Sequence, residues 1–95
     1  MARYKVDYEE LTAALADLSG WEEKEGKLHK TYKFDSFAQA IGWMVSVAVH
    51  ADKMDHHPEW SNVYNKVEVN LVTHDMDNAI SNLDIELARQ MDALA

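Results

Sequence analysis

The sequence of 95 residues contains no cysteine, only one proline and only three glycines. Without cysteine there can be no disulfide, no thiolate nucleophile and no cysteine-based zinc site, and the chain is compatible with a reducing, cytoplasmic location. Basic residues are also scarce, since nine lysines and arginines stand against 17 aspartates and glutamates, which gives a net charge of -8. Because that charge repels a phosphate backbone, we expect no direct binding to nucleic acid.

Long hydrophobic runs are missing as well. The longest apolar stretch, around residues 41–49, is far too short to span a bilayer, and no apolar segment follows the two basic residues of the N-terminus. We therefore expect neither membrane insertion nor secretion. A content of 47% hydrophobic and 27% charged residues is typical of a packed globule, and the length predicts one domain, residues 1–95. For so small a domain without disulfides, oligomerisation is a reasonable way to bury more apolar surface.

Three capping pairs predict the starts of three helices. The pairs are Asp7 with Glu10, Ser36 with Gln39, and Ser81 with Asp84. The first helix ends at Gly20, and the second, the most buried, runs to about Met54. Apolar residues at three- and four-residue spacing predict the inner faces. These stripes are Tyr8, Leu11, Leu15 and Leu18; then Phe37, Ile41, Met44, Val45 and Ala48, widened by Trp43 and Val47; then Leu83, Leu87, Met91 and Leu94, with Ile80 just ahead of the cap.

Two hairpins lie between these helices. Residues 21–24 and 27–34 flank the turn signal Glu25-Gly26, and residues 60–64 and 66–74 flank a turn at Asn65. Alternation places Leu28, Tyr32 and Phe34 on one face of the first hairpin, and Val67, Val69, Leu71 and Thr73 opposite Glu68, Asn70, Val72 and His74 in the second. The order α-β-β-α-β-β-α predicts an α+β fold, a four-stranded antiparallel sheet with helices packed on one face.

Three of the five histidines flank the second hairpin. Its strands run in opposite directions, so the chain at His56 and His57 is expected to approach the chain at His74. Imidazole, with a pKa of about 6.5, can act as an acid or a base near neutral pH. The pattern therefore favours acid–base chemistry, whereas His29, on the outer face of the first hairpin, and His50, near the end of the second helix, are expected to be structural.

Other interpretations of these residues are a metal site, a serine nucleophile and purely structural roles. With Asp55 and Asp75, the histidines offer enough ligands for a metal ion, but adjacent histidines in extended chain point in opposite directions and no His-Glu-x-x-His helix is present. We therefore expect no metal. The serines stand in no Gly-x-Ser-x-Gly context, which excludes a hydrolase elbow. Asp84 could be only a helix cap, and Trp60 and Tyr64 could be core aromatics.

Residues 52–67, which read DKMDHHPEWSNVYNKV, together with Thr73-His74 and Leu83-Asp84, resemble the pterin-4a-carbinolamine dehydratases. The resemblance combines an acidic residue four places before the first histidine, the triplet His56-His57-Pro58, Tyr64 six places after the proline, His74 ten places later, and Asp84 at the next helix start. Asp52 stands where many relatives have glutamate, and the loop from His74 to Asp84 is one residue longer. The likeness extends to the C-terminus and is looser over the first thirty-odd residues.

The resemblance implies loss of water from a 4a-hydroxytetrahydropterin, giving the quinonoid dihydropterin and recycling the tetrahydropterin cofactor. The pterin is then the substrate, and no cofactor is expected. Catalysis is assigned to His56 as the principal acid/base, to His74 as a second one serving the opposite face of the ring, to His57 mainly as a positioning residue, and to Asp84 as an orienting carboxylate. The substrate-binding set is His57, Asp55, Pro58, Trp60 and Asp52.

The resemblance also implies partners. A homodimer or homotetramer is expected, with functional coupling to an aromatic amino-acid hydroxylase. Because vertebrate members also serve as a dimerisation partner of a homeodomain transcription factor, the alternative functions are a protein-interaction module, acting through an apolar face around Ile41, Met44 and Val45, and a pterin-binding relative with another substrate. The clustered histidines favour catalysis, since a module kept only for contacts does not need them.

Overall fold

Helices and strands follow one another in the order that the sequence predicts. The computed structural model describes residues 2–95, and its elements run as follows: α1 Tyr8–Asp17, β1 Glu22–Lys24, β2 Lys27–Lys33, α2 Phe37–Met54, β3 Glu59–Val63, β4 Lys66–Leu71, the short 3-10 helix η1 His74–Met76, and α3 Asn82–Leu94. The expected hairpin turn at Glu25-Gly26 is present, and both residues have positive φ, 53° and 79°, as its backbone twist requires.

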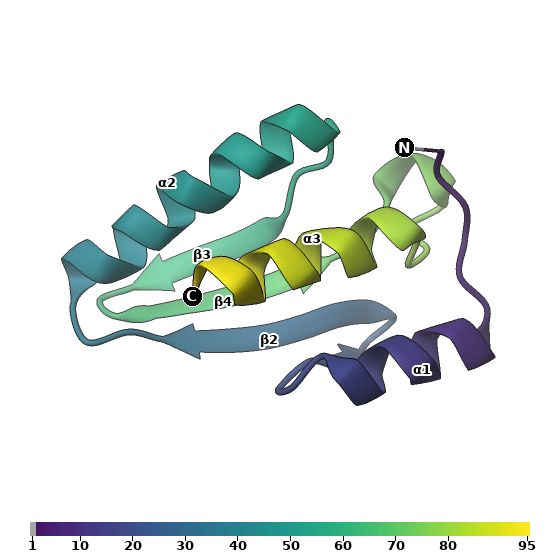
Figure 1. Ribbon diagram of the computed structural model, residues 1–95, viewed down its shortest axis with the longest axis horizontal. Coiled ribbons are helices and arrows are strands. Elements are labelled where there is room, and N and C mark those ends of the chain that lie inside the picture. Colours follow the sequence, from purple (N-terminus) through teal and green to yellow (C-terminus); the bar gives the residue numbers. More distant parts are fainter. Residues whose placement is uncertain (1) are drawn as a thin grey trace.

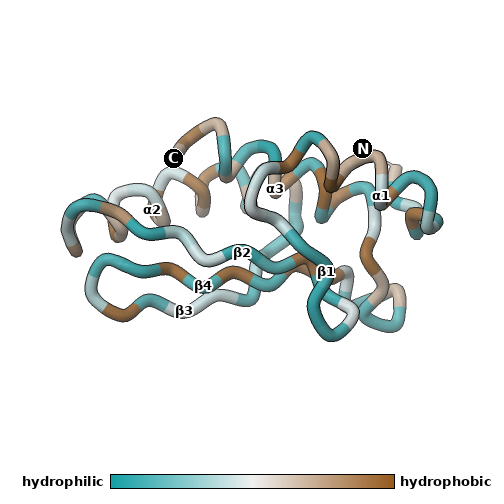
Figure 2. Tube along the Cα trace, turned by 90° about the horizontal axis from the view of Figure 1, so that it is seen from below, coloured by the Kyte–Doolittle hydropathy of each residue, from teal (hydrophilic) through white to brown (hydrophobic). Residues whose placement is uncertain are grey.

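The four strands form one antiparallel sheet in the order β1-β2-β4-β3. Tyr32 of β2 lies opposite Val67 of β4, and Trp60 of β3 lies opposite Val69. All three helices lie on the same side of the sheet (Figures 1 and 2). In β4 the buried Val67, Val69 and Leu71 alternate with the polar Lys66, Glu68 and Asn70, which point to the other side. The predicted α+β architecture, with helices on one face, is therefore confirmed.

The core fills the space between the sheet and the helices. Its strand side chains include Leu28, Val67, Val69 and Leu71, all fully buried. Trp43 of α2 gathers the aromatic side chains: its ring centroid lies 4.4 Å from that of Tyr32 and 6.0 Å from that of Trp60. The Trp43 indole N–H donates to the Met91 carbonyl at 3.0 Å. A buried aromatic of this size, with its polar group satisfied, makes a large contribution to stability and fixes α2 against α3.

The predicted inner face of α2 is wrong in part. Trp43 and Val47 face the sheet as expected, and they do so with Ala40 and Ala51. Phe37 and Val45 are instead 52% and 60% exposed. Because α2 is apolar around most of its circumference, spacing alone does not fix its rotation, and the large Trp43 decides it. Within residues 2–95, no helix is long and apolar enough to cross a membrane.

Smaller corrections concern the ends of elements. Tyr8, predicted on the inner face of α1, is 80% exposed, because Asp7 caps the helix just before it and the buried stripe starts at Leu11. Tyr64, predicted in a strand, lies in the β3–β4 turn with φ of 53°. Val72, predicted on the outer face, is buried because β4 ends at Leu71 and the chain bends. Leu94 is 38% exposed at the last turn of α3.

Candidate active site

The end of α2 presents the first two histidines. Asp55 adopts the left-handed conformation at φ 50°, ψ 44°, and the His56 N–H donates to the Ala51 carbonyl at 3.0 Å. This arrangement satisfies the last helical carbonyls and reverses the chain direction, as left-handed C-caps do. Pro58 then prevents any helical continuation, and β3 begins one residue later. His56 and His57 therefore occupy a short, well-defined link between helix and strand.

The second hairpin brings His74 to the same place. Glu59 at the start of β3 lies opposite Asn70 near the end of β4, so the segments just beyond these residues are neighbours. His56, His57 and His74 line one cavity of about 240 Å³, together with Arg3, Asp55 and Asp75. The predicted proximity of the three histidines is confirmed.

His56 contacts a buried carboxylate, that of Asp84. Its Nε2 lies 2.6 Å from Oδ1 of Asp84, and the side chains are 8% and 0% exposed. Asp84 is the third residue of α3, where the positive end of the helix dipole favours an anion. Asp84 and His56 are 28 positions apart in the sequence, so this is a tertiary contact, and the start of α3 fixes the orientation of the His56 ring.

The other oxygen of Asp84 is occupied by two donors. Oδ2 accepts from the Ser81 backbone N–H at 2.8 Å, which is the capping-box bond, and from the Thr73 hydroxyl at 2.9 Å. Thr73 and Ser81 are 1% and 0% exposed, and their hydroxyl oxygens lie 2.6 Å apart. One carboxylate thus serves as helix cap through one oxygen and as histidine partner through the other. The helix cap expected from the sequence therefore coexists with the contact to His56.

The other two histidines of the cavity, His57 and His74, also contact carboxylates through Nε2, but these contacts are exposed to solvent. His57 lies 3.1 Å from Asp52 Oδ1, and both side chains are more than half exposed. His74 lies 2.7 Å from Glu59 Oε2, while Lys27 contacts the other oxygen at 2.6 Å. Hydrogen bonding from His74, and then from Lys27, lowers the pKa of Glu59 below its usual value. The Glu59 carboxylate is therefore anionic at neutral pH.

The remaining predicted residues lie in different surroundings. Asp55 lines the cavity. Pro58 is half-buried. Trp60 follows Glu59 in β3 and packs against Trp43 in the core, so the side chains of Trp60 and Glu59 lie on opposite faces of the strand. Tyr64 is 64% exposed at the opposite end of the hairpin. The roles of Pro58 and Trp60 toward a substrate stay predictions.

Two residues of the cavity were not predicted as part of an acid–base site. Arg3 forms an ion pair with Asp75 across 72 positions of sequence, and the pair borders the histidines. The sequence suggests Asp75, beside His74, only as a metal ligand. No local signal marks Arg3, since it precedes the first helix and reaches the site only through the fold. Within residues 2–95, no three histidine or carboxylate side chains converge in a way that could hold a metal ion.

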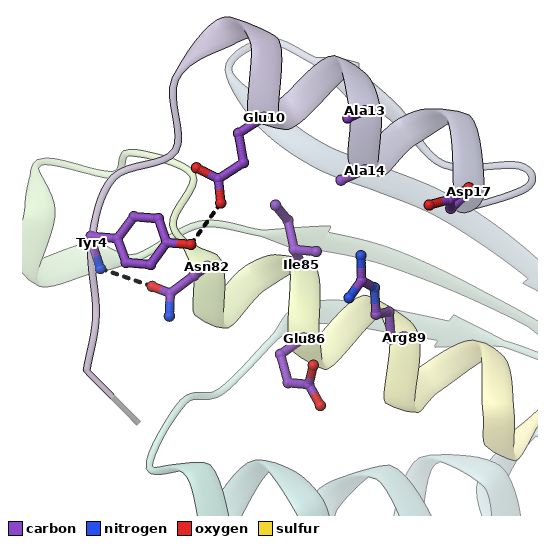
Figure 3. A pocket seen from close by; sticks show the side chains of 9 residues that line it. All are labelled: Tyr4, Glu10, Ala13, Ala14, Asp17, Asn82, Ile85, Glu86 and Arg89. Carbon is purple, nitrogen blue, oxygen red and sulfur yellow. Dashed lines mark hydrogen bonds between the residues drawn. The ribbon is translucent and has the colours of Figure 1, made fainter.

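A larger cavity, of about 360 Å³, lies between α1 and α3 (Figure 3). In it the Tyr4 hydroxyl donates to Glu10 at 2.6 Å, and the Tyr4 N–H donates to Asn82 at 2.8 Å. Its lining contains no histidine. The histidine cavity is smaller, but it holds the groups suited to proton transfer, so it is the better candidate site.

These observations define a class: a small α+β domain with three helices on one face of a four-stranded sheet, with a cavity lined by histidines whose Nε2 atoms face carboxylates. Comparison with known proteins gives the family. The family model described as pterin 4 alpha carbinolamine dehydratase matches residues 4–94. A protein of Jannaschia sp. (strain CCS1), provisionally named a pterin-4-alpha-carbinolamine dehydratase, is 58% identical over 85 residues, covering 87% of this chain and 85% of that one.

A protein of Brucella ovis with the same provisional name is 43% identical over 97 residues, covering 100% of this chain and 99% of its own. A crystal structure described as a transcriptional coactivator/pterin dehydratase from Brucella melitensis matches with a TM-score of 0.91 at 41% identity, covering 97% of this chain and 99% of that one. The chain belongs to the pterin-4a-carbinolamine dehydratase family, and it is a dehydratase, that is, a hydro-lyase.

Proposed function

We propose that the protein removes water from a 4a-hydroxytetrahydropterin, with histidines as general acid and base, and so returns the pterin to the cofactor cycle of an aromatic amino-acid hydroxylase. The observation that carries this proposal is that three histidines line one cavity, each with Nε2 directed at a carboxylate. Family membership supplies the substrate class. The product of this dehydration is a quinonoid dihydropterin.

The carboxylates determine which ring nitrogen is available. A neutral imidazole carries one N–H, and a carboxylate that faces Nε2 draws the proton to that atom. Nδ1 of His56 and of His74 then keeps a lone pair and is the nitrogen left for the substrate. His56 is the better fixed of the two, because its partner Asp84 is fully buried. His74 is 60% exposed and can exchange protons with solvent.

The proposed reaction needs two proton transfers and no redox partner. One protonated imidazole gives a proton to the 4a-hydroxyl, the C4a–O bond breaks, and water leaves. The other imidazole takes the proton from N5, and the N5 electron pair forms the C4a–N5 double bond. Each transfer contributes about 10²–10⁴-fold to the rate. His56 is the principal acid/base, His74 the second, and His57, with Asp52 and Asp55 beside it, positions the pterin.

Turnover of enzymatically generated carbinolamine tests this assignment. His56→Ala is expected to lose most of kcat, and His74→Ala a smaller part. His50→Ala, which changes a half-buried histidine of α2 outside the cavity, is the matched control and should retain activity. Wild-type turnover in both site variants would refute the acid–base roles. Turnover unchanged after dialysis against a chelator is expected, because the proposal includes neither metal nor other cofactor.

We also propose that the protein self-associates through α2. Phe37, Val45 and Val49 are each more than half exposed on this helix, and together they form an apolar face that a monomer leaves in water. A dimer or tetramer covers it. Light scattering of the wild type should give a multiple of 10.9 kDa, and Val45→Lys should lower the mass. A monomeric wild type would contradict self-association.

The alternative function, a protein-interaction module, would act through the neighbouring face around Ile41, Met44 and Val45, which shares Val45 with the proposed self-association face and in which Ile41 and Met44 are half-buried. The histidine cavity favours the enzyme, because contacts on α2 need no imidazoles near α3. A coupled assay separates the two: the protein should accelerate turnover of an aromatic amino-acid hydroxylase without forming a complex with it. A stable complex without acceleration would favour the module. The absence of cysteine is compatible with the proposed cytoplasmic location.

A further inference from the structure

The hydroxyls of Thr73 and Ser81 form a buried chain that ends on Asp84 and is unused in the reaction as described so far. Thr73 donates to Asp84 Oδ2, and a threonine hydroxyl has one hydrogen. Thr73 therefore accepts in its 2.6 Å contact with Ser81, and Ser81 is the donor. Ser81 Oγ in turn accepts from the Leu83 N–H at 3.1 Å. Each hydrogen in the chain has a fixed direction.

The hydrogen bonds donated to Asp84 Oδ2 determine where the hydrogen lies between Asp84 and His56. Asp84 Oδ2 accepts from two donors, and both donors favour the charged carboxylate. A buried carboxylate without them would take a proton to escape the cost of burial. The nearest proton is the one on His56 Nε2, 2.6 Å away. If Asp84 held that proton, the carboxylic acid would donate to Nε2, and the ring would take a replacement proton from solvent on Nδ1, which leaves no lone pair there for the substrate.

We propose that Thr73 is a positioning residue that keeps Asp84 charged and thereby holds His56 in the tautomer with hydrogen on Nε2 and a lone pair on Nδ1. The inference rests on the proposed acid–base role of His56 for its catalytic meaning, but the tautomer itself is independent of any substrate. Thr73 is suited to this task because it directly precedes His74 and pairs through its backbone N–H with Ala79 at 2.8 Å. Its hydroxyl is therefore held in place by the same loop that presents the second acid/base.

Thr73→Val tests the proposal, since valine keeps the shape and removes the hydroxyl. The tautomer of His56 is read from the ¹⁵N chemical shifts of its ring at neutral pH in histidine-labelled protein, assigned with His56→Gln. The wild type should have hydrogen on Nε2. Thr73→Val should shift the population toward hydrogen on Nδ1 and lower kcat about tenfold, the effect of losing one hydrogen bond to a charged group. Thr73→Ser should restore both.

Thr31→Val is the matched control, because Thr31 is exposed in β2 and lies outside the cavity. It should leave the tautomer and kcat unchanged. A purely structural role of Thr73 would lower stability while the His56 signals stay the same, and this outcome would overturn the proposal. Hydrogen on Nδ1 in the wild type would overturn it too, even if Thr73→Val failed to fold. If the wild type had no dehydratase activity, the proposed function would fail while the ring signals still decided the tautomer.

Discussion

Asp84→Asn gives the sharpest test of the site, because the structure dictates how the amide must sit. Two donors, the Thr73 hydroxyl and the Ser81 N–H, converge on Oδ2, so the amide oxygen must take that position. The amide nitrogen then occupies the position of Oδ1, 2.6 Å from His56 Nε2. An NH₂ group can only donate, so Nε2 must accept and the hydrogen of the ring must move to Nδ1.

The expected loss follows from that reversal. His56 would present N–H where the base needs a lone pair, and general acid–base catalysis at that position is worth about 10²–10⁴-fold. We therefore expect kcat to fall by at least about 10²-fold. The fold should persist, because asparagine keeps the acceptor for the helix cap and is itself a favourable residue near a helix start.

Stopped-flow measurement of carbinolamine decay gives kcat, and chemical denaturation gives the stability of the same preparation. Asp17→Asn, an exposed aspartate at the last residue of α1, is the control for the loss of one charge and should behave as wild type. An Asp84→Asn variant that is folded and retains more than a third of wild-type kcat would refute the tautomer argument. Equal losses in both variants would point to net charge instead.

Two further predictions concern pH. Burial, and then the hydrogen bond to Asp92, raise the pKa of Tyr32 far above the usual value of 10.0. The folded state thus retains a proton that the unfolded state releases above pH 10. The stabilisation from this tyrosine is full below pH 10 and falls above it, by about 1.4 kcal/mol at pH 11. Urea denaturation should find this alkaline loss absent in Tyr32→Phe and retained in the exposed-site control Tyr8→Phe. Hydrogen bonding from His74, and then from Lys27, lowers the pKa of Glu59 from 4.5. Its stabilising effect is therefore present above pH 4.5 and is lost as pH falls through the lowered pKa. Glu59→Gln and wild type should converge in stability as the pH is lowered below 4.5, and a gap that persists in strong acid would contradict the ion pair.

The second hairpin could be predicted well from the sequence, because only local sequence patterns are needed to infer it. Period-two alternation along residues 66–71 fixes which side chains are buried, and antiparallel pairing then brings the two outer ends of the hairpin together. The approach of His56 and His57 to His74 follows without knowledge of the helices. Asp84 could be assigned as a helix cap for the same reason, since capping depends on a spacing of three residues.

Features that depend on packing between distant segments could not be predicted. Asp84 meets His56 across 28 positions, and Arg3 meets Asp75 across 72, so neither contact leaves a local signal. An orienting role of Asp84 was expected only through the family resemblance, and nothing indicated the pair of Arg3 with Asp75. The rotation of α2 was wrong at Phe37 and Val45 because an almost wholly apolar helix offers more than one plausible inner face. Only the fit of Trp43 among the other aromatic rings distinguishes these faces.

Because one oxygen of Asp84 caps α3 and the other contacts His56, the start of α3 and the histidine site are expected to lose their structure together on heating. The first turn of a helix is where local opening usually begins, at a lower free energy than global unfolding. If the start of α3 opens, Asp84 leaves His56 at the same moment that it leaves the Ser81 N–H, so the site loses its base while the sheet is still intact. Thermal inactivation of this enzyme should therefore precede its melting transition, and amide exchange at Ser81 and the residues after it should follow the loss of activity.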